Sequence, residues 1–240
     1  MTRVCRAALN HLGRIGAARS ELGLHPVFDT RRVSFARNLE MNWRTIRSEL
    51  DSVLTEPHKI PGFQEISPDQ SHLTRDDHWK TFFLFAFGYR SDRNCARCPE
   101  TSRLIAEIPG LTTAFFSILK AGARLPAHRG VYSGLLRYHL GLRVPEPTEK
   151  TAMRVGNRTV HWREGESILF DDSFEHESWN DTDALRAVLI VDVLRPLPMP
   201  WSLLNRGIVS LISRTPLVQE GRRNFEQWHE RANQRVPTGA

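Results

Sequence analysis

The fold is decided by FDDSFEHESW at residues 170–179, read together with an earlier region that holds PAHRG at residues 126–130 and LRYHLGL at residues 136–142. His128 and His176 stand at the ends of expected strands, and two imidazoles can hold a transition metal. Arg186 follows His176 by ten residues and supplies a cation for an anionic ligand. These segments predict one site built from distant parts of the chain.

From about residue 110 onward the sequence is a succession of short strands separated by turn formers. Gly156-Asn157, between two of these strands, is a hairpin signal. Short antiparallel strands at this spacing favour a sandwich or jelly roll over a parallel sheet. The expected strands cover residues 113–120, 134–142, 151–155, 158–162, 166–171, 176–180 and 186–194.

Helical patterns flank this mainly β region. Residues 36–56 carry apolar side chains at helical spacing, and residues 100–108 predict a short helix that ends before Pro109. Between them, residues 81–87 are rich in phenylalanine and predict a buried strand, and residues 90–99 predict a loop.

The composition is that of a soluble globular protein, with 240 residues, 40% hydrophobic and 25% charged. No run approaches the roughly 20 apolar residues that span a bilayer, and the N-terminal region has no continuous apolar segment typical of a secretory signal. We therefore expect a cytoplasmic location. Cys95 and Cys98 form a lone CxxC, which we interpret as ordinary loop thiols.

The net charge of +6 belongs to the two ends of the chain. Residues 1–40 hold seven arginines and three acids, a balance of +4, and residues 201–240 hold six arginines and three acids, a balance of +3. The remaining residues 41–200 therefore carry −1. We expect no nucleic-acid partner, because no basic and aromatic stripe is present. An anionic membrane surface suits the basic termini better.

The two terminal segments allow two interpretations each. Residues 1–30 predict a loose extension rather than an amphipathic helix. In residues 201–212 the apolar side chains are expected to form one helical stripe, flanked by polar Asn205 and basic Arg206. We expect this helix to pack on the β region, and the alternative is an interfacial helix in peripheral contact with a membrane.

Strand alternation places Leu135, Arg137 and His139 on one face of their strand. A buried guanidinium costs several kcal/mol unless it meets an anion. The same reasoning applies to Arg186, which begins an almost wholly apolar strand. Two histidines beside two such arginines favour a metal site over structural histidines. The second residue after His128, a common position for a carboxylate ligand, is Gly130, so spacing alone leaves iron, copper, zinc and nickel open.

Residues 117–195 resemble the catalytic domain of the aspartyl/asparaginyl β-hydroxylases. The most specific block is FDDSFEHE at residues 170–177. Upstream similarity at WKTFFL (79–84) and CPET (98–101) extends the resemblance to about residues 36–225. The other segments that carry it are SIL (117–119), PAH (126–128), LRYHLGL (136–142), WREG (162–165) and IVDV (190–193).

This resemblance implies a double-stranded β-helix of cupin-like jelly-roll type that binds iron(II) through His128 and His176 alone. Its 2-oxoglutarate contacts map to Ser117, His139 and Arg186, where Arg186 pairs with the distal carboxylate. Arg137 maps to an arginine that lines the cofactor and substrate pocket, and it is a candidate catalytic residue. The implied organisation is a basic extension over 1–35, a dioxygenase domain over 36–200 with its barrel at about 110–195, and a helical segment over 201–240.

The implied reaction uses molecular oxygen and converts 2-oxoglutarate to succinate while it hydroxylates a C–H bond next to a carbonyl-bearing carbon, with ascorbate as an accessory reductant. Two substrate classes stay open: an aspartyl, asparaginyl or other amino-acid unit, and the acyl chain of a bacterial lipid. Leu135 stands where the aspartyl hydroxylases have a further arginine, which favours the lipid. The alternatives are a halogenase at the same iron, a non-catalytic cupin-like binding module and a zinc hydrolase. Four acids in the 170–179 block either orient the imidazoles or are turn and strand-edge charges: Asp171, Asp172, Glu175 and Glu177.

Overall fold

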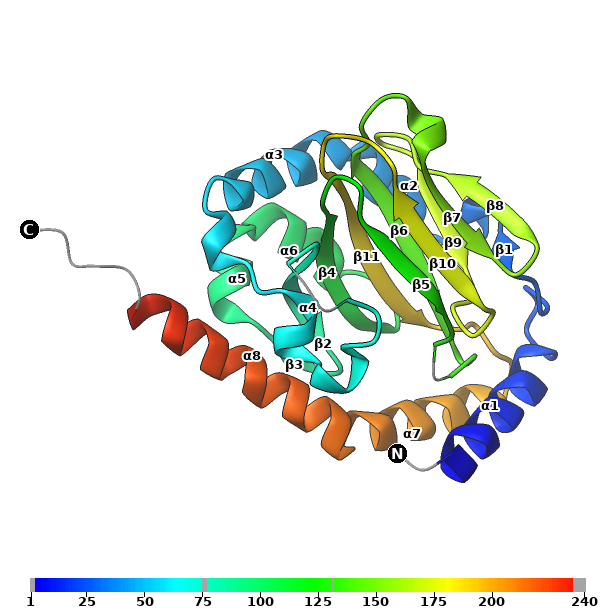
Figure 1. The fold of residues 1–240 in the computed structure, drawn as a ribbon. Coiled ribbons are helices and arrows are strands. Elements are labelled where there is room, and N and C mark those ends of the chain that lie inside the picture. Colours follow the sequence, from blue (N-terminus) through cyan, green and yellow to red (C-terminus); the bar gives the residue numbers. More distant parts are fainter. Residues whose placement is uncertain (1–2, 75–76, 131, 235–240) are drawn as a thin grey trace, which may run out of the picture.

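The computed structural model describes residues 3–74, 77–130 and 132–234. Two antiparallel sheets pack face to face (Figure 1), one with the strand order β1-β9-β6-β11-β4-β2-β3 and one with the order β5-β10-β7-β8. The strands are β1 (Val27–Phe28), β2 (Trp79–Ala86), β3 (Tyr89–Arg90), β4 (Leu111–Leu119), β5 (Arg124–His128), β6 (Leu135–Arg143), β7 (Thr151–Val155), β8 (Arg158–His161), β9 (Ser167–Phe170), β10 (His176–Asn180) and β11 (Arg186–Leu194).

From β4 to β11 the chain passes repeatedly from one sheet to the other, with the β7–β8 hairpin as the only consecutive pair within a sheet. This is the jelly roll, or double-stranded β-helix, and the predicted fold class is confirmed. The faces that the two sheets turn toward each other share an apolar core, which includes Phe115, Met153, Trp162 and Val188. Polar side chains that point into this interior therefore share a space of low dielectric.

Helices cover the outer face of the larger sheet. The α-helices are α1 (Arg3–Ala17), α2 (Ala36–Met41), α3 (Trp43–Leu54), α4 (Phe63–Ile66), α5 (Asp92–Arg97), α6 (Pro99–Ala106), α7 (Trp201–Ser213) and α8 (Pro216–Gln234). Ile46 and Leu50 of α3 share a buried cluster with Leu136 and Tyr138, which point outward from β6. The predicted helix over 36–56 is present as α2 and α3, separated at Asn42.

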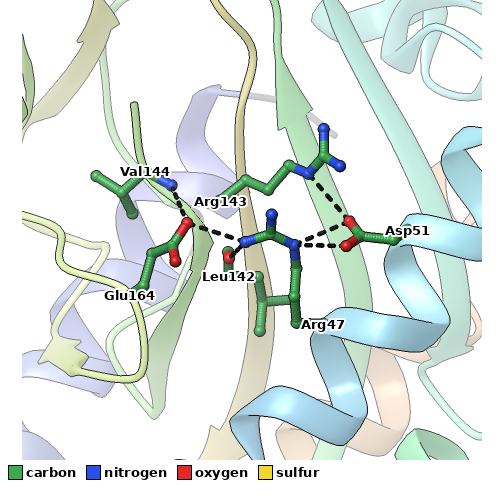
Figure 2. A network of polar contacts seen from close by, with 6 residues as sticks. All are labelled: Arg47, Asp51, Leu142, Arg143, Val144 and Glu164. Carbon is green, nitrogen blue, oxygen red and sulfur yellow. Dashed lines mark hydrogen bonds and ion pairs between the residues drawn. The ribbon is translucent and has the colours of Figure 1, made fainter. Parts of the chain in front are cut away.

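A polar network fastens α3 to the end of β6 (Figure 2). Arg47 donates to Asp51 one turn later at 2.8 Å and to Glu164 at 2.9 Å, and it also bonds the carbonyl of Leu142. Arg143 approaches the same Asp51 at 3.0 Å. Helix α3 is thus held to the sheet by apolar packing and, at the sheet edge, by the Arg47 guanidinium, which bonds several partners at once.

Three helices lie along one side of the sheets, namely α1, α7 and α8 (Figure 1). The expected loose extension is wrong for residues 3–17, because they form α1, while residues 1–2 lie outside the described part. The single apolar stripe expected on 201–212 is also wrong. Val209 and Ile212 face inward, whereas Leu203, Leu204 and Leu211 are exposed on the other side of α7.

Two further expectations differ from the structure. Residues 92–97 form α5 inside the predicted loop, because Ser91 caps the helix by accepting a hydrogen bond from the Asn94 backbone. Cys95 and Cys98 are consequently buried thiols rather than loop thiols. Within the described residues no helix is long and apolar enough to cross a membrane.

Candidate active site

His128 and His176 face each other across the smaller sheet. His128 ends β5, His176 begins β10, and the two residues are direct cross-strand partners. Their ring centroids lie 4.1 Å apart. Strand β5, which contains Pro126, was not among the strands expected from the sequence. The edge position of β5 tolerates this proline, because one side of an edge strand needs no ladder hydrogen bond.

Each imidazole is oriented by the backbone just before it. Nδ1 of His128 lies 2.8 Å from the Pro126 carbonyl, and Nδ1 of His176 lies 2.9 Å from the Phe174 carbonyl. A carbonyl only accepts, so both rings carry their proton on Nδ1 and keep the Nε2 lone pair. This is the tautomer that a metal-binding histidine uses.

Both histidines are held neutral. Burial lowers the pKa of His128 to about 4, with the neighbouring His176 adding to the effect, and burial also lowers the pKa of His176 to about 4. Neutral imidazole is the form that binds metals. In the described part of the chain, no three His, Cys, Asp or Glu side chains gather as a ready-made metal cluster. The donors available here are therefore the two imidazoles.

The Asp172 carboxylate occupies the space that a side chain at position 130 would need. The backbone N–H of Gly130 donates to the Asp172 carbonyl at 2.7 Å. A Cβ added at Gly130 would overlap the Asp172 carboxylate. This carboxylate is itself held 3.4 Å from Arg137. A side chain at position 130 would therefore displace the Asp172 carboxylate, and glycine itself offers no ligand atom.

The larger sheet turns three further polar residues into the interior, as strand alternation predicts. His139 on β6 is the register partner of Ile190, and Ser117 on β4 is the partner of Val188. Arg186 lies at the start of β11 on the same face as these two apolar residues. The Ser117 hydroxyl accepts a hydrogen bond from Nε1 of Trp79 at 3.0 Å and keeps its own proton to donate.

Buried donors without partners gather at the end of the site formed by His139, Trp162 and Arg186. The Arg186 guanidinium lies over the Trp162 ring at 4.3 Å, and Trp162 stacks near His139 with 6.0 Å between ring centroids. Among the described residues, Arg186 Nε, Trp162 Nε1 and both His139 ring nitrogens have no hydrogen-bond partner. Burial lowers the pKa of Arg186 to about 9 and that of His139 well below its usual range. A bound anion would neutralise the Arg186 charge and accept hydrogen bonds from these donors.

Arg137 differs from Arg186 because its charge is already neutralised. It donates to both carboxylate oxygens of Asp192, its cross-strand partner, at 2.7 and 2.9 Å. Asp172 adds a third contact at 3.4 Å. Asp192 was not among the site residues predicted from the sequence, although antiparallel pairing of β6 with β11 would have placed it opposite Arg137.

The remaining acids of the 170–179 block have partners of their own. Asp171 forms a fully buried ion pair with Arg195. Glu175 and Glu177 both contact Arg154 on the neighbouring strand β7. Trp162 is the aromatic residue that supports Arg186, and in the sequence it is marked only by its place in WREG (162–165).

Comparison with solved structures finds cupin domains at low similarity. The Schizosaccharomyces pombe Cnp3 cupin domain matches with a TM-score of 0.36 and 11% identity over 55% of this chain and 72% of that one. A cupin domain of an XRE family transcriptional regulator from Enterobacter cloacae matches with a TM-score of 0.34 and 11% identity, over 50% of this chain and 99% of that one. The jelly-roll assignment rests on the strand order described above.

Comparison with protein families is more specific. A family model described as aspartyl/asparaginyl β-hydroxylase matches residues 40–196. The ornithine lipid ester-linked acyl 2-hydroxylase of Rhizobium tropici is 44% identical over 231 residues, covering 96% of this chain and 82% of that protein. Human aspartyl/asparaginyl beta-hydroxylase is 33% identical over 70% of this chain, which matches only 22% of that longer protein. Because the family model spans more than half of the sequence and the Rhizobium relative aligns along nearly all of it, this chain belongs to the aspartyl/asparaginyl β-hydroxylase family.

Proposed function

We propose that this protein is an iron(II)- and 2-oxoglutarate-dependent hydroxylase that acts on the ester-linked acyl chain of a membrane lipid. Its hydroxylase relatives support an enzyme. The observation that carries the proposal is Arg186, a guanidinium only 2% exposed that has no carboxylate among its described contacts. Burying a cation costs several kcal/mol unless an anion pairs with it. An unpaired buried cation is therefore expected at a site where a bound ligand supplies the anion.

The residues fit the two groups that the family implies. His128 and His176 would hold iron(II) through their Nε2 atoms, since imidazole suits iron. Arg186 would pair with the distal carboxylate of 2-oxoglutarate, and Ser117 and His139 would offer further donors beside it. When bound, iron(II) and 2-oxoglutarate would allow molecular oxygen to be used as the oxidant: one oxygen atom enters a substrate C–H bond and the other enters succinate, while 2-oxoglutarate loses carbon dioxide.

The chain's own part in this chemistry is positioning and exclusion of water. Backbone carbonyls fix both imidazoles, and the Phe170 ring packs edge-on against His176, with 5.7 Å between ring centroids, in an apolar cluster that also contains Ile190. His139 remains neutral at pH 7 because burial lowers its pKa, so it can donate one hydrogen bond without adding charge. Arg137 forms an ion pair with Asp192, and this pair carries no net charge.

Two observations support the lipid as substrate class, namely the Rhizobium relative and Leu135. That relative aligns along nearly the whole chain and is named for an acyl 2-hydroxylase. Leu135, two residues before Arg137, packs against the apolar cluster of Tyr132, Val209 and Ile212 instead of offering a charge to an acidic substrate. An acyl chain suits such a surface better than an aspartyl side chain does.

Halogenation at the same metal is disfavoured by the space at Gly130. A halide would need room beside the metal on the side where the third ligand is missing. The Asp172 carboxylate lies directly above Gly130, and its negative charge repels another anion.

The test is turnover by purified protein supplied with iron(II), 2-oxoglutarate and oxygen. Detergent-dispersed ornithine lipid and an aspartate-containing peptide are offered separately, and mass spectrometry follows succinate and the gain of one oxygen atom. We expect oxygen gain at the carbon next to the ester carbonyl of the lipid. Oxygen gain on the peptide alone would move the substrate to the amino-acid class.

Two variants check the site within this assay. His176→Ala should abolish iron-dependent succinate formation. Arg186→Met should raise the 2-oxoglutarate concentration needed for half-maximal rate by about tenfold or more, if a charge-assisted bond of about 1.5–3 kcal/mol is lost. Arg158→Met, on the exposed strand β8, is the matched control and should behave as the unaltered protein. An unchanged 2-oxoglutarate requirement in Arg186→Met would remove Arg186 from the cofactor site.

A further inference from the structure

Helix α7 presents an exposed apolar face to solvent. Leu203, Leu204 and Leu211 are 58%, 47% and 65% exposed, whereas Asn205, Val209 and Ile212 on the opposite face are buried. Gly207 lies between the exposed leucines, with no other atom near the position of a Cβ. Just before the helix, Met199 is 66% exposed. Such a grouping on one side of one helix differs from scattered surface apolar residues, and it marks an interaction face.

The two chain segments that form this face carry charges of a single sign. Residues 193–219 contain no Asp or Glu and three arginines, of which Arg206 on α7 and Arg214 at its end are exposed, whereas Arg195 is buried and paired with Asp171. Residues 1–20 likewise contain no acid and four arginines. These are the two acid-free basic stretches at the ends of a chain whose middle is slightly negative.

The fold brings these two stretches together. The guanidinium of Arg19 lies 4.5 Å above the Trp201 ring, and Gly16 of α1 faces Leu197 and Trp201 at van der Waals distance. Leu12, on α1, is 45% exposed. Helices α1 and α7 thus lie side by side along one side of the molecule (Figure 1) and combine into one basic and apolar surface, which we call the α1–α7 face.

The inner side of this face supports the loop that follows His128. Asn205 of α7 donates to the Gly134 carbonyl at 2.9 Å. Tyr132 packs against Val209 and Ile212, and Gly13 of α1 approaches Ser133 so closely that a Cβ there would lie 2.6 Å from its Oγ. The helices that present leucines outward therefore carry, on their other side, the segment leading out of the candidate metal site.

We propose that the α1–α7 face docks on the surface of an anionic lipid bilayer, with the leucines inserted among the acyl chains and the arginines at the level of the headgroups. Leucines interleaved with arginines and no acid are the pattern of an interfacial helix. Charge complementarity selects the bilayer over a second copy of this chain, because two α1–α7 faces brought together would oppose like charges. This inference goes beyond the proposed function, since docking needs neither iron nor turnover.

The experiment is co-sedimentation of the full chain, without iron or 2-oxoglutarate, with vesicles of phosphatidylcholine alone or mixed with phosphatidylglycerol. We expect binding to the mixed vesicles, weak binding to phosphatidylcholine, and loss of binding as salt is raised, because exposed charges are screened. Equal binding to both vesicle types would overturn the electrostatic half of the proposal, and binding to neither would overturn all of it.

Paired variants separate the two contributions. Substituting Ser for Leu203, Leu204 and Leu211 together should weaken binding at least about tenfold, since apolar area no longer enters the bilayer. Arg206→Gln should weaken it about fivefold, the effect of one cation near an anionic surface. The matched controls are Met41→Ser and Arg158→Gln, which alter exposed residues of α2 and β8 far from α7 (Figure 1).

Two results would contradict the assignment of this face. Retained vesicle binding in the leucine variant would place the membrane contact elsewhere. A dimer in light scattering that the leucine variant converts to a monomer, without vesicle binding by the unaltered chain, would assign the face to a second copy instead. Because all these measurements omit iron and 2-oxoglutarate, their failure leaves the detergent-based turnover test of the proposed function intact.

Discussion

At the scale of single residues, the site is defined by which buried charges are neutralised within the chain. Arg137 has two carboxylate partners, Asp192 and Asp172, whereas Arg186 rests on the face of Trp162 and has none among the described residues. A cation–π contact gives a desolvated guanidinium about 2 kcal/mol, less than the cost of burying it. The difference between these two arginines separates a structural charge from one that is available to a ligand.

A second fully buried arginine, Arg195, connects three segments around the site. Arg195 donates to the Ser133 carbonyl at 2.8 Å and to the Gly23 carbonyl at 3.0 Å, and it pairs with Asp171. Ser133 belongs to the loop after His128, and Asp171 to the turn before His176. Arg195 thus ties both histidine-bearing segments to the N-terminal region.

We predict that Arg195→Leu destabilises the protein by about 3–5 kcal/mol, because it leaves the Asp171 carboxylate buried without its cation. The free energy of unfolding in urea measures this. Arg31→Leu is the control: it breaks an ion pair with Asp29 whose arginine is 88% exposed, and exposed pairs contribute at most about 1 kcal/mol. A loss in Arg195→Leu no larger than in the control would show that the buried pair is not needed for stability.

At the scale of elements, period-2 and helical patterns predicted most strands and the helices α2, α3 and α6, and strand alternation placed Arg137 and His139 inward. The pattern failed at β5, because Pro126 reads as a turn unless the strand is known to lie at a sheet edge. It failed again at α7, where apolar side chains serve two faces and periodicity does not say which one is buried. Partners such as Asp192 and Trp162 come from strand pairing, which depends on the whole fold.

Helix α8 packs His229 against Phe225, with their ring centroids 4.5 Å apart. Burial lowers the pKa of His229 to about 4, and Arg93 and Arg97 nearby add to the effect. The unfolded chain, with a histidine pKa near 6.5, binds this proton more readily than the folded chain does. Stability from this residue is therefore fully present above pH 6.5 and is lost as the pH falls toward 4.

We predict that the free energy of unfolding falls less between pH 7 and pH 5 in His229→Gln than in the unaltered chain. The difference between the two falls is about 1 kcal/mol once the partial exposure of His229 is allowed for. Urea unfolding at a series of pH values measures the difference. At pH 8 His229 is neutral in both the folded and the unfolded state, so the stability difference between the two proteins at this pH is the reference. Parallel stability curves across this range would show that α8 does not bury His229 in its neutral form.

At the scale of the whole molecule, the two sheets would supply different halves of the proposed site. The smaller sheet contributes the histidine pair, and the larger sheet contributes Ser117, His139 and Arg186. A ligand that contacts both halves joins the sheets, so it binds the folded chain and not the unfolded one. Its free energy of binding then appears as added stability.

We predict that manganese(II), which replaces iron without turnover, raises the unfolding temperature, and that 2-oxoglutarate raises it further only when the metal is present. At a 2-oxoglutarate concentration about 100 times its dissociation constant the added stability is about 2.7 kcal/mol, or about 5–10 °C for a protein of this size. His176→Ala should lose both increments. Arg186→Met should keep the metal increment, lose the 2-oxoglutarate increment, and unfold no earlier than the unaltered chain without ligands, because it removes an unpaired buried charge. An equal 2-oxoglutarate increment in Arg186→Met would show that the larger sheet does not supply the anion-binding half of the site.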